Sequence, residues 1–87
     1  MNLDALLAEL VARKGSDLFI TVGTPPTLKI NGHLVSLGSE ALDKQGALTL
    51  VRETLSPEHF ERYIRTKEGN YAIHREALGR FRVSAFW

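Results

Sequence analysis

The chain has 87 residues, of which 44% are hydrophobic and 24% are charged, a composition typical of one small globular domain. A net charge of +1 argues against the strong positive field of a nucleic-acid binder, and the lack of cysteine excludes disulfides and thiolate metal sites. Asp4 and Glu9 interrupt the first apolar stretch, which is therefore not a secretory signal. No window approaches the roughly 18 apolar residues of a membrane span. We therefore expect a soluble cytoplasmic protein without membrane insertion.

The first element that the sequence predicts is an amphipathic helix over residues 3–11. Its apolar residues recur at i, i+3, i+4, i+7 and i+8, and they are Leu3, Leu6, Leu7, Leu10 and Val11. Asn2 can cap the amino end of this helix, and Gly15 can take the left-handed position that ends it. The leucine stripe can belong to the core or contact another subunit, and the core is the favoured interpretation.

Extended structure is predicted after this helix. Residues 16–22 are mostly apolar on both faces and too short for a helix, which indicates a buried strand. Residues 27–37 predict a hairpin around Asn31-Gly32, because both central positions of a type I′ turn need a positive φ. This turn fixes two cross-strand pairs on one face of the hairpin, Ile30 with His33 and Leu28 with Val35.

The second half of the chain predicts two helices followed by two strands. Asp43 can cap the first of these helices, and Ser56-Pro57 begins the other. The latter helix offers two i,i+4 ion pairs, Glu58 with Arg62 and Glu61 with Arg65. A period of two then indicates strands at residues 70–74 and 80–87. The predicted class is α+β, an antiparallel sheet with helices packed on one side, in the order α-β-β-β-α-α-β-β.

The last predicted strand is still continuing where the sequence stops, at Trp87. A domain rarely ends on an aromatic residue in the middle of a strand. We therefore expect residues 1–87 to be a single domain taken from a longer protein.

Two segments carry a resemblance to a known family. Residues 15–34 read GSDLFITVGTPPTLKINGHL, and residues 69–87 read GNYAIHREALGRFRVSAFW. Together these segments resemble the N-terminal domain of the PilT/PilU-type ATPases of the secretion ATPase superfamily, which retract type IV pili in twitching motility. PilT-like members carry histidine in place of Phe19 and asparagine in place of Ser84, and these two departures resemble the PilU-like branch.

The resemblance implies both a fold and a function. Members of the family are hexameric rings in which a PAS-like N-terminal domain precedes a RecA-like ATPase domain, and ATP with magnesium binds between the two domains. Residues 1–87 would form the PAS-like domain, with the ATPase domain further along the protein. The implied partners are the ATPase domains of the same and neighbouring subunits, a PilT-like paralogue and the inner-membrane platform of the pilus. The implied location is the cytoplasm at the base of the pilus.

A phosphate-binding loop is missing from the sequence. Such a loop has the form G-x-x-x-x-G-K-[ST]. Its glycines let backbone amides surround the phosphates, its lysine neutralises phosphate charge, and its serine or threonine hydroxyl binds the magnesium ion. No such motif occurs in the 87 residues. We therefore expect no ATP hydrolysis, no catalytic residue and no bound cofactor or metal in this domain, although the full-length protein would be an ATPase motor.

Arg82 and Arg80 are the candidate binding residues. Alternation along the last predicted strand places both on one face, and a guanidinium offers a charged, planar fork of donors that suits phosphate. The resemblance implies that an arginine at the position of Arg82 reaches the nucleotide phosphates when the domain closes, and Arg80 is the weaker candidate. In the alternative interpretation, both arginines are solvated or pair with Glu68 and Glu76.

Other polar groups have structural explanations beside the functional ones. Ser16-Asp17 can be a nucleophile–carboxylate pair or a turn, and the turn is favoured because no G-x-S-x-G elbow surrounds the serine. Pro25-Pro26 can form a recognition surface or only shape the bend between two strands. The histidines lack the spacing of a metal site, and they are His33, His59 and His74. We expect His33 to be a structural histidine beside the apolar face of the hairpin.

Two classes of function compete on this sequence. The first is an interface and regulatory domain of a ring motor, which docks on the ATPase domain and helps to close the nucleotide site. The second is a PAS-like sensor of a small molecule or nucleotide, which is less favoured because His33 and Thr21 are the main candidates for buried polar groups. Nucleic-acid binding would suit the alternating arginines and aromatics of RFRVSAFW, but the near-zero net charge opposes it.

Overall fold

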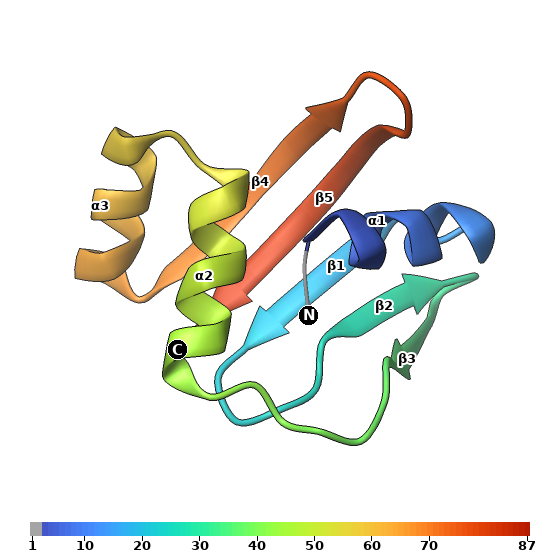
Figure 1. Ribbon diagram of the computed structural model, residues 1–87, viewed down its shortest axis with the longest axis horizontal. Helices are drawn as coiled ribbons and strands as arrows, with labels where there is room; N and C mark the ends of the chain where they lie inside the picture. The colour runs from blue at the N-terminus through green and yellow to red at the C-terminus, as the bar shows by residue number, and fades with distance from the viewer. Residues whose placement is uncertain (1–2) are drawn as a thin grey trace.

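The computed structural model describes residues 3–87 as three helices and one five-stranded sheet (Figure 1). The helices are α1 (Leu3–Ala12), α2 (Lys44–Thr54) and α3 (Pro57–Thr66). The strands are β1 (Asp17–Thr21), β2 (Thr27–Ile30), β3 (His33–Ser36), β4 (Glu68–Arg75) and β5 (Gly79–Phe86). The predicted cap Asn2 lies outside the described residues. Within residues 3–87, none of the helices is long and apolar enough to cross a membrane.

The sheet has the strand order β3-β2-β1-β5-β4 and is mixed rather than antiparallel. The β1–β2, β2–β3 and β4–β5 pairs are antiparallel, but β1 and β5 at the centre are parallel. The prediction of an antiparallel sheet is therefore wrong at this pair. A period of two indicates which side chains share a face but not the direction of the partner strand. Between β1 and β5 the chain forms β2, β3, α2, α3 and β4. The α+β class is confirmed, and the PAS-like assignment stays a prediction.

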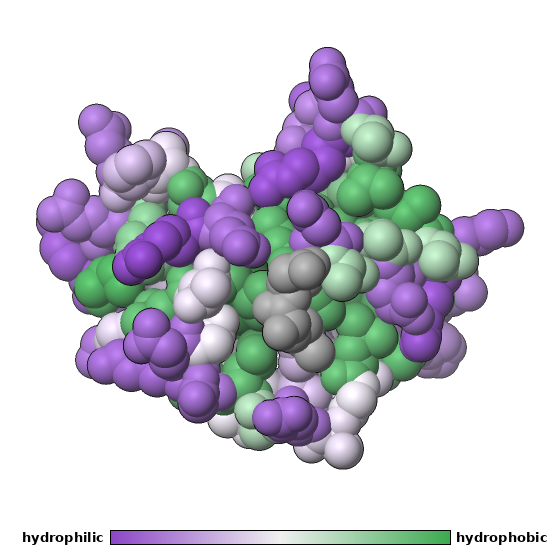
Figure 2. All heavy atoms as spheres, viewed as in Figure 1, coloured by the Kyte–Doolittle hydropathy of each residue, from purple (hydrophilic) through white to green (hydrophobic). Residues whose placement is uncertain are grey.

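All three helices contribute buried side chains to one core on the same face of the sheet. The central strands point alternate residues into this core, namely Leu18 and Ile20 from β1 and Phe81, Val83 and Ala85 from β5. Four leucines of the predicted stripe in α1 are buried, whereas Val11 is exposed. Figure 2 views this helical side, where polar side chains project from the periphery and apolar ones lie between them. The leucine stripe is therefore part of the core.

The end of α1 differs from the predicted one. Lys14, and not Gly15, takes the left-handed conformation, with a φ of 58°. The amide of Gly15 donates to the carbonyl of Leu10 at 2.8 Å, so the helix closes one residue earlier than expected. A Cβ atom at Gly15 would lie 2.5 Å from Leu10 Cδ1 and 3.0 Å from the carbonyl oxygen of Lys29. Glycine is required there because β2 and α1 approach the backbone closely.

Replacing Gly15 with alanine is therefore expected to destabilise the domain by about 1–3 kcal/mol, because the added methyl group overpacks the junction of α1 and β2. Urea unfolding of the unsubstituted chain and of the Gly15→Ala variant would measure this difference in stability. The matched control is Lys14→Gly, which frees the left-handed position and should retain or raise stability. The opposite ranking of the two variants would contradict this account of the helix end.

The predicted hairpin is confirmed in its turn and its register. Asn31 and Gly32 have φ values of 52° and 79°, and the cross-strand partners are those that the turn predicts. His33, however, is exposed, so the prediction of a structural histidine is wrong. β3 is a short strand at the edge of the sheet, and His33 lies there beside the hairpin turn, exposed to water.

Both predicted caps of the later helices are present. The carboxylate of Asp43 accepts from the amide of Gly46 at 2.7 Å, and the hydroxyl of Ser56 accepts from the amide of His59 at 3.4 Å. Pro57 occupies the first turn of α3. These caps therefore fix the residues at which α2 and α3 begin.

Candidate functional site

One face of the sheet carries no helix in the part of the chain that the structure describes. Residues on this uncovered face alternate with the core residues of β1, β4 and β5. The central part of the face consists of Asp17, Phe19, Thr21, Asn70, Ala72, His74, Arg80, Arg82, Ser84 and Phe86. We call this set the open face. The side chain of Phe86 is 40% exposed, and Phe19 is half-buried.

The two candidate arginines lie on the open face, as alternation along the strand predicts. Both side chains are exposed, and Arg82 lies between Asp17 of β1 and Ala72 of β4 in the register. Within residues 3–87 the structure contains one ion pair, between Arg13 and Glu9. Of the alternative interpretation, the pairing with Glu68 or Glu76 is absent within residues 3–87, whereas solvated arginines agree with the structure. Within residues 3–87 neither guanidinium forms an ion pair, although Asp17 is the register partner of Arg82 on the same face.

The remaining sequence candidates are explained by packing. Ser16 donates its hydroxyl hydrogen to the side chain of Asp17, and its carbonyl accepts from the amide of Arg82 at 3.2 Å, so the pair belongs to the start of the β1–β5 pairing. Pro26 is buried, and its carbonyl accepts from the amide of Leu37 at 2.8 Å, as expected of a bend between strands. In residues 3–87 no group of three metal-ligating side chains is brought together.

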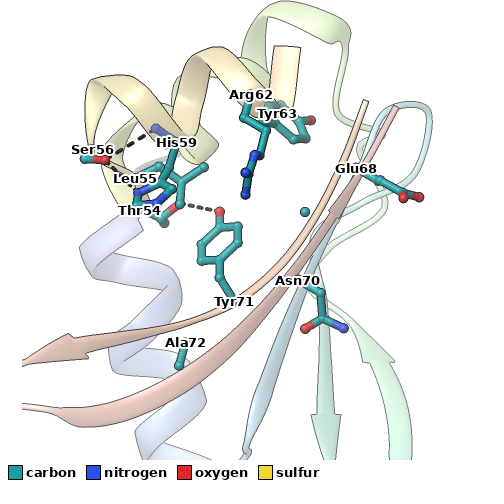
Figure 3. A pocket seen from close by; sticks show the side chains of 11 residues that line it. Thr54, Leu55, Ser56, His59, Arg62, Tyr63, Glu68, Asn70, Tyr71 and Ala72 are labelled. Carbon is teal, nitrogen blue, oxygen red and sulfur yellow. Dashed lines mark hydrogen bonds between the residues drawn. The ribbon is translucent and has the colours of Figure 1, made fainter. Parts of the chain in front are cut away.

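A hollow that the sequence did not predict lies between the α2–α3 junction and β4 (Figure 3). We call it the β4 cleft. Its volume is about 340 Å³, and its lining consists of Thr54, Leu55, Ser56, His59, Arg62, Tyr63, Glu68, Gly69, Asn70, Tyr71 and Ala72. These residues come from separate segments of the chain, so no local motif could have indicated the cleft.

Tyr71 forms the floor of the cleft and is held in place by a short chain of hydrogen bonds. The hydroxyl of Thr54 donates to the carbonyl of Val51 at 2.7 Å, which uses its one hydrogen. The hydrogen bond between Thr54 and Tyr71 must therefore be donated by the tyrosine. Burial of the phenol raises the pKa of Tyr71 from 10.0 to about 12, against the opposite effect of the bond to Thr54.

The pKa of Tyr71 leads to a test by alkaline titration. Because the folded chain holds this proton more tightly than the unfolded chain, the resulting stability is present below pH 10 and is lost as the pH rises through about 12. Phenolate absorbance should therefore show fewer than half of the two tyrosines ionised at pH 10, since burial also raises the pKa of Tyr63. Tyr71→Phe should remove the later step. Ordinary titration of both tyrosines in the folded chain would contradict the burial of Tyr71.

The end of the chain is anchored beside this helix pair. The amide of Trp87 donates to the carbonyl of Lys67 at 3.1 Å, and its ring meets that of Tyr63 edge-on with centroids 6.3 Å apart. The ammonium groups of Lys44 and Lys67 lie 4.7 Å and 5.3 Å from the indole centroid. These contacts hold the indole of Trp87 against α2 and α3.

No family model matches the sequence. Over all 87 residues the chain is 36% identical to the type IV pilus ATPase PilU of Pseudomonas aeruginosa, and it spans 23% of the length of that protein, at its N-terminal part. The fold matches part of the crystal structure of the pilus retraction motor PilT with bound ADP. That match has a TM-score of 0.77 and 20% identity, and it covers 94% of this chain and 24% of the PilT chain. The chain belongs to the N-terminal domains of PilT/PilU-type ATPases.

The two segments that carry the resemblance, residues 15–34 and 69–87, contain the paired strands β1 and β5 of the open face. Phe19 and Ser84, the two positions at which this chain departs from the PilT-like pattern, are direct neighbours in the parallel β1–β5 pair. Ser84 is only 6% exposed although it lies on the open face. The large side chain of Phe19 in β1 therefore lies beside the small side chain of Ser84 in β5, at the centre of the open face.

Proposed function

We propose that this domain is the interface domain of a hexameric type IV pilus retraction ATPase and docks through its open face on a RecA-like ATPase domain. The observation that carries the proposal is that the open face combines half-exposed aromatic residues with two arginines that form no ion pair within residues 3–87. A sheet in a folded domain is normally covered on the face that carries large apolar side chains. A domain from the same ring supplies such a cover.

The arginines give this contact a chemical role. Arg82 is exposed beside the centre of the open face, and Arg80 lies two residues away on the same strand. In the proposed contact Arg82 reaches the phosphates of ATP bound with magnesium by the ATPase domain, and Arg80 lies at the rim. The guanidinium would reach the phosphates only when the two domains close, so the domain would regulate turnover without containing the catalytic machinery.

The wider setting follows from the family. The ATPase would act in the cytoplasm at the inner-membrane base of the pilus, together with a PilT-like paralogue, and would contribute to twitching motility. PilU is a type IV pilus ATPase and PilT is a pilus retraction motor. The present chain is similar to the N-terminal part of PilU.

A charge on the open face tests the docking directly. Phe86→Asp in the full-length protein is expected to lower ATPase activity about 10-fold, because an apolar contact of roughly 1.4 kcal/mol or more is replaced by a buried carboxylate. The control is Val11→Asp, since Val11 is equally exposed, at 41%, but lies on α1. Steady-state turnover of both variants, with size-exclusion chromatography for assembly, would measure this. Equal activity of the two variants would contradict docking through the open face.

A further inference from the structure

The β4 cleft contains a charged side chain that the proposed docking does not use. Arg62 points from α3 into the cleft toward Tyr71, whereas the carboxylate of Glu68 on the rim points away (Figure 3). The predicted ion pair of Arg62 with Glu58 is absent, and within residues 3–87 the guanidinium has no acidic partner. One positive charge without a counter-ion therefore faces a hollow of about 340 Å³.

The hydrogen-bonding groups around Arg62 add a second donor. Ser56 lies 2.8 Å from Nδ1 of His59, and when the serine hydroxyl donates to this nitrogen, Nε2 carries the ring hydrogen. His59 and Arg62 are three residues apart on α3 and line the same cleft. The hydrogen of the Tyr71 hydroxyl is already given to Thr54. The fork of Arg62 and, with this tautomer, the imidazole N–H of His59 are therefore donors available to a ligand.

We propose that the β4 cleft is a binding site for a phosphomonoester of a small planar molecule. The fork of Arg62 and the N–H of His59 supply three donors, which match the three terminal oxygens of a phosphoryl group better than the two of a carboxylate. The cleft volume lies at the lower end of the range for pockets that enclose small organic ligands, and it exceeds what a bare phosphate needs. The planar part of the ligand lies against Tyr71 and Leu55.

The cleft shares Asn70 and Ala72 with the open face, but its donors lie on α3, so variants of Arg62 and of Arg82 test the two proposals independently. The proposal extends the alternative function, a sensor of a small molecule, by giving the location of the binding site and the chemical class of the ligand. The site uses side chains of α3 and the outer edge of β4, whereas the open face is centred on β1 and β5. A bound ligand would join α3 to β4 at the sheet edge and so stiffen the helix pair against which Trp87 packs.

Four probes separate the chemistry of the site, with the 87-residue chain, whose own elements supply its core, as the binding partner. Phenyl phosphate carries ring and phosphoryl group, phenol the ring alone, inorganic phosphate the anion alone, and benzoate the ring with a carboxylate. Titration monitored by backbone amide NMR should show phenyl phosphate binding at least 10-fold more tightly than the other three, with shifts in α3 and β4. Equal binding of phenol, of inorganic phosphate or of benzoate would overturn the proposal.

Two variants of α3 complete the test. Arg62→Gln should weaken phenyl phosphate binding at least 10-fold, whereas Arg65→Gln removes the same charge from the same helix outside the cleft and should change binding less than 2-fold. His59→Ala should give an intermediate loss. Circular dichroism of each variant confirms that it is folded, and all three positions are exposed. Equal losses in Arg62→Gln and Arg65→Gln would show binding by general charge and would overturn the site.

Discussion

Replacing Arg82 with alanine in the full-length ATPase is expected to lower ATP turnover roughly 100-fold while leaving the hexamer intact. The guanidinium of Arg82 is exposed on β5 and has no acidic partner within residues 3–87, so its removal costs the fold little. In the proposed contact the guanidinium stabilises negative charge on the phosphates in the transition state, so its loss raises the activation free energy of hydrolysis. Steady-state hydrolysis and size-exclusion chromatography of the same preparation would measure both parts.

The neighbouring arginine supplies the control for this prediction. Arg80 is also exposed on the same strand and face, but it lies nearer to the β4–β5 turn. Arg80→Ala should therefore reduce turnover less than Arg82→Ala, and Arg82→Lys should recover only part of the activity because lysine lacks the planar fork. Unchanged turnover in Arg82→Ala would end the assignment of Arg82 to the nucleotide.

The second large effect concerns stability and the centre of the sheet. Leu18→Ala is expected to destabilise the domain by about 2–5 kcal/mol, because Leu18 is fully buried between the sheet and the helices and its removal leaves a cavity. This is a large part of the stability of so small a domain. Urea unfolding followed by circular dichroism would measure it.

The control for this effect is an apolar residue of the same size in the same sheet. Leu34 on the edge strand β3 is 66% exposed, so Leu34→Ala should change stability by no more than about 0.5 kcal/mol. If both leucines cost the same, the core would not lie on the helical side of β1.

Features that depend on near neighbours could be predicted from the sequence. The Asn31-Gly32 turn fixed the hairpin register, and the caps Asp43 and Ser56 marked the starts of α2 and α3, because each involves atoms within a few residues. The parallel pairing of β1 with β5 could not be predicted, because it joins strands that more than fifty residues separate.

The choice between Lys14 and Gly15 at the end of α1 failed for the same reason. It depends on the carbonyl of Lys29 in β2, which is distant in the sequence but would lie 3.0 Å from a Cβ atom at Gly15. Local helix-ending preference favoured glycine in the left-handed position, and tertiary packing gave that position to lysine instead.

The candidate site likewise has a part that local sequence predicts and a part that depends on tertiary packing. Alternation within one strand was sufficient to place Arg80 and Arg82 on a shared face. The β4 cleft depends on Thr54, Arg62 and Tyr71, which meet only after α2, α3 and β4 have packed. The resemblance gave no indication of the cleft, because both matching segments lie largely in the strands and leave α2 and α3 out.

If another domain covers the open face in the assembled ATPase, a cysteine placed on that face should be protected from labelling there. Ala72 is exposed beside Arg82 on the open face, and the 87 residues contain no natural cysteine to interfere. Ala72→Cys should react with maleimide rapidly in the isolated 87-residue chain and at least 10-fold more slowly in the full-length hexamer, while Val11→Cys on α1 should react equally fast in both. If Ala72→Cys reacts equally fast in both, the open face is not an interface.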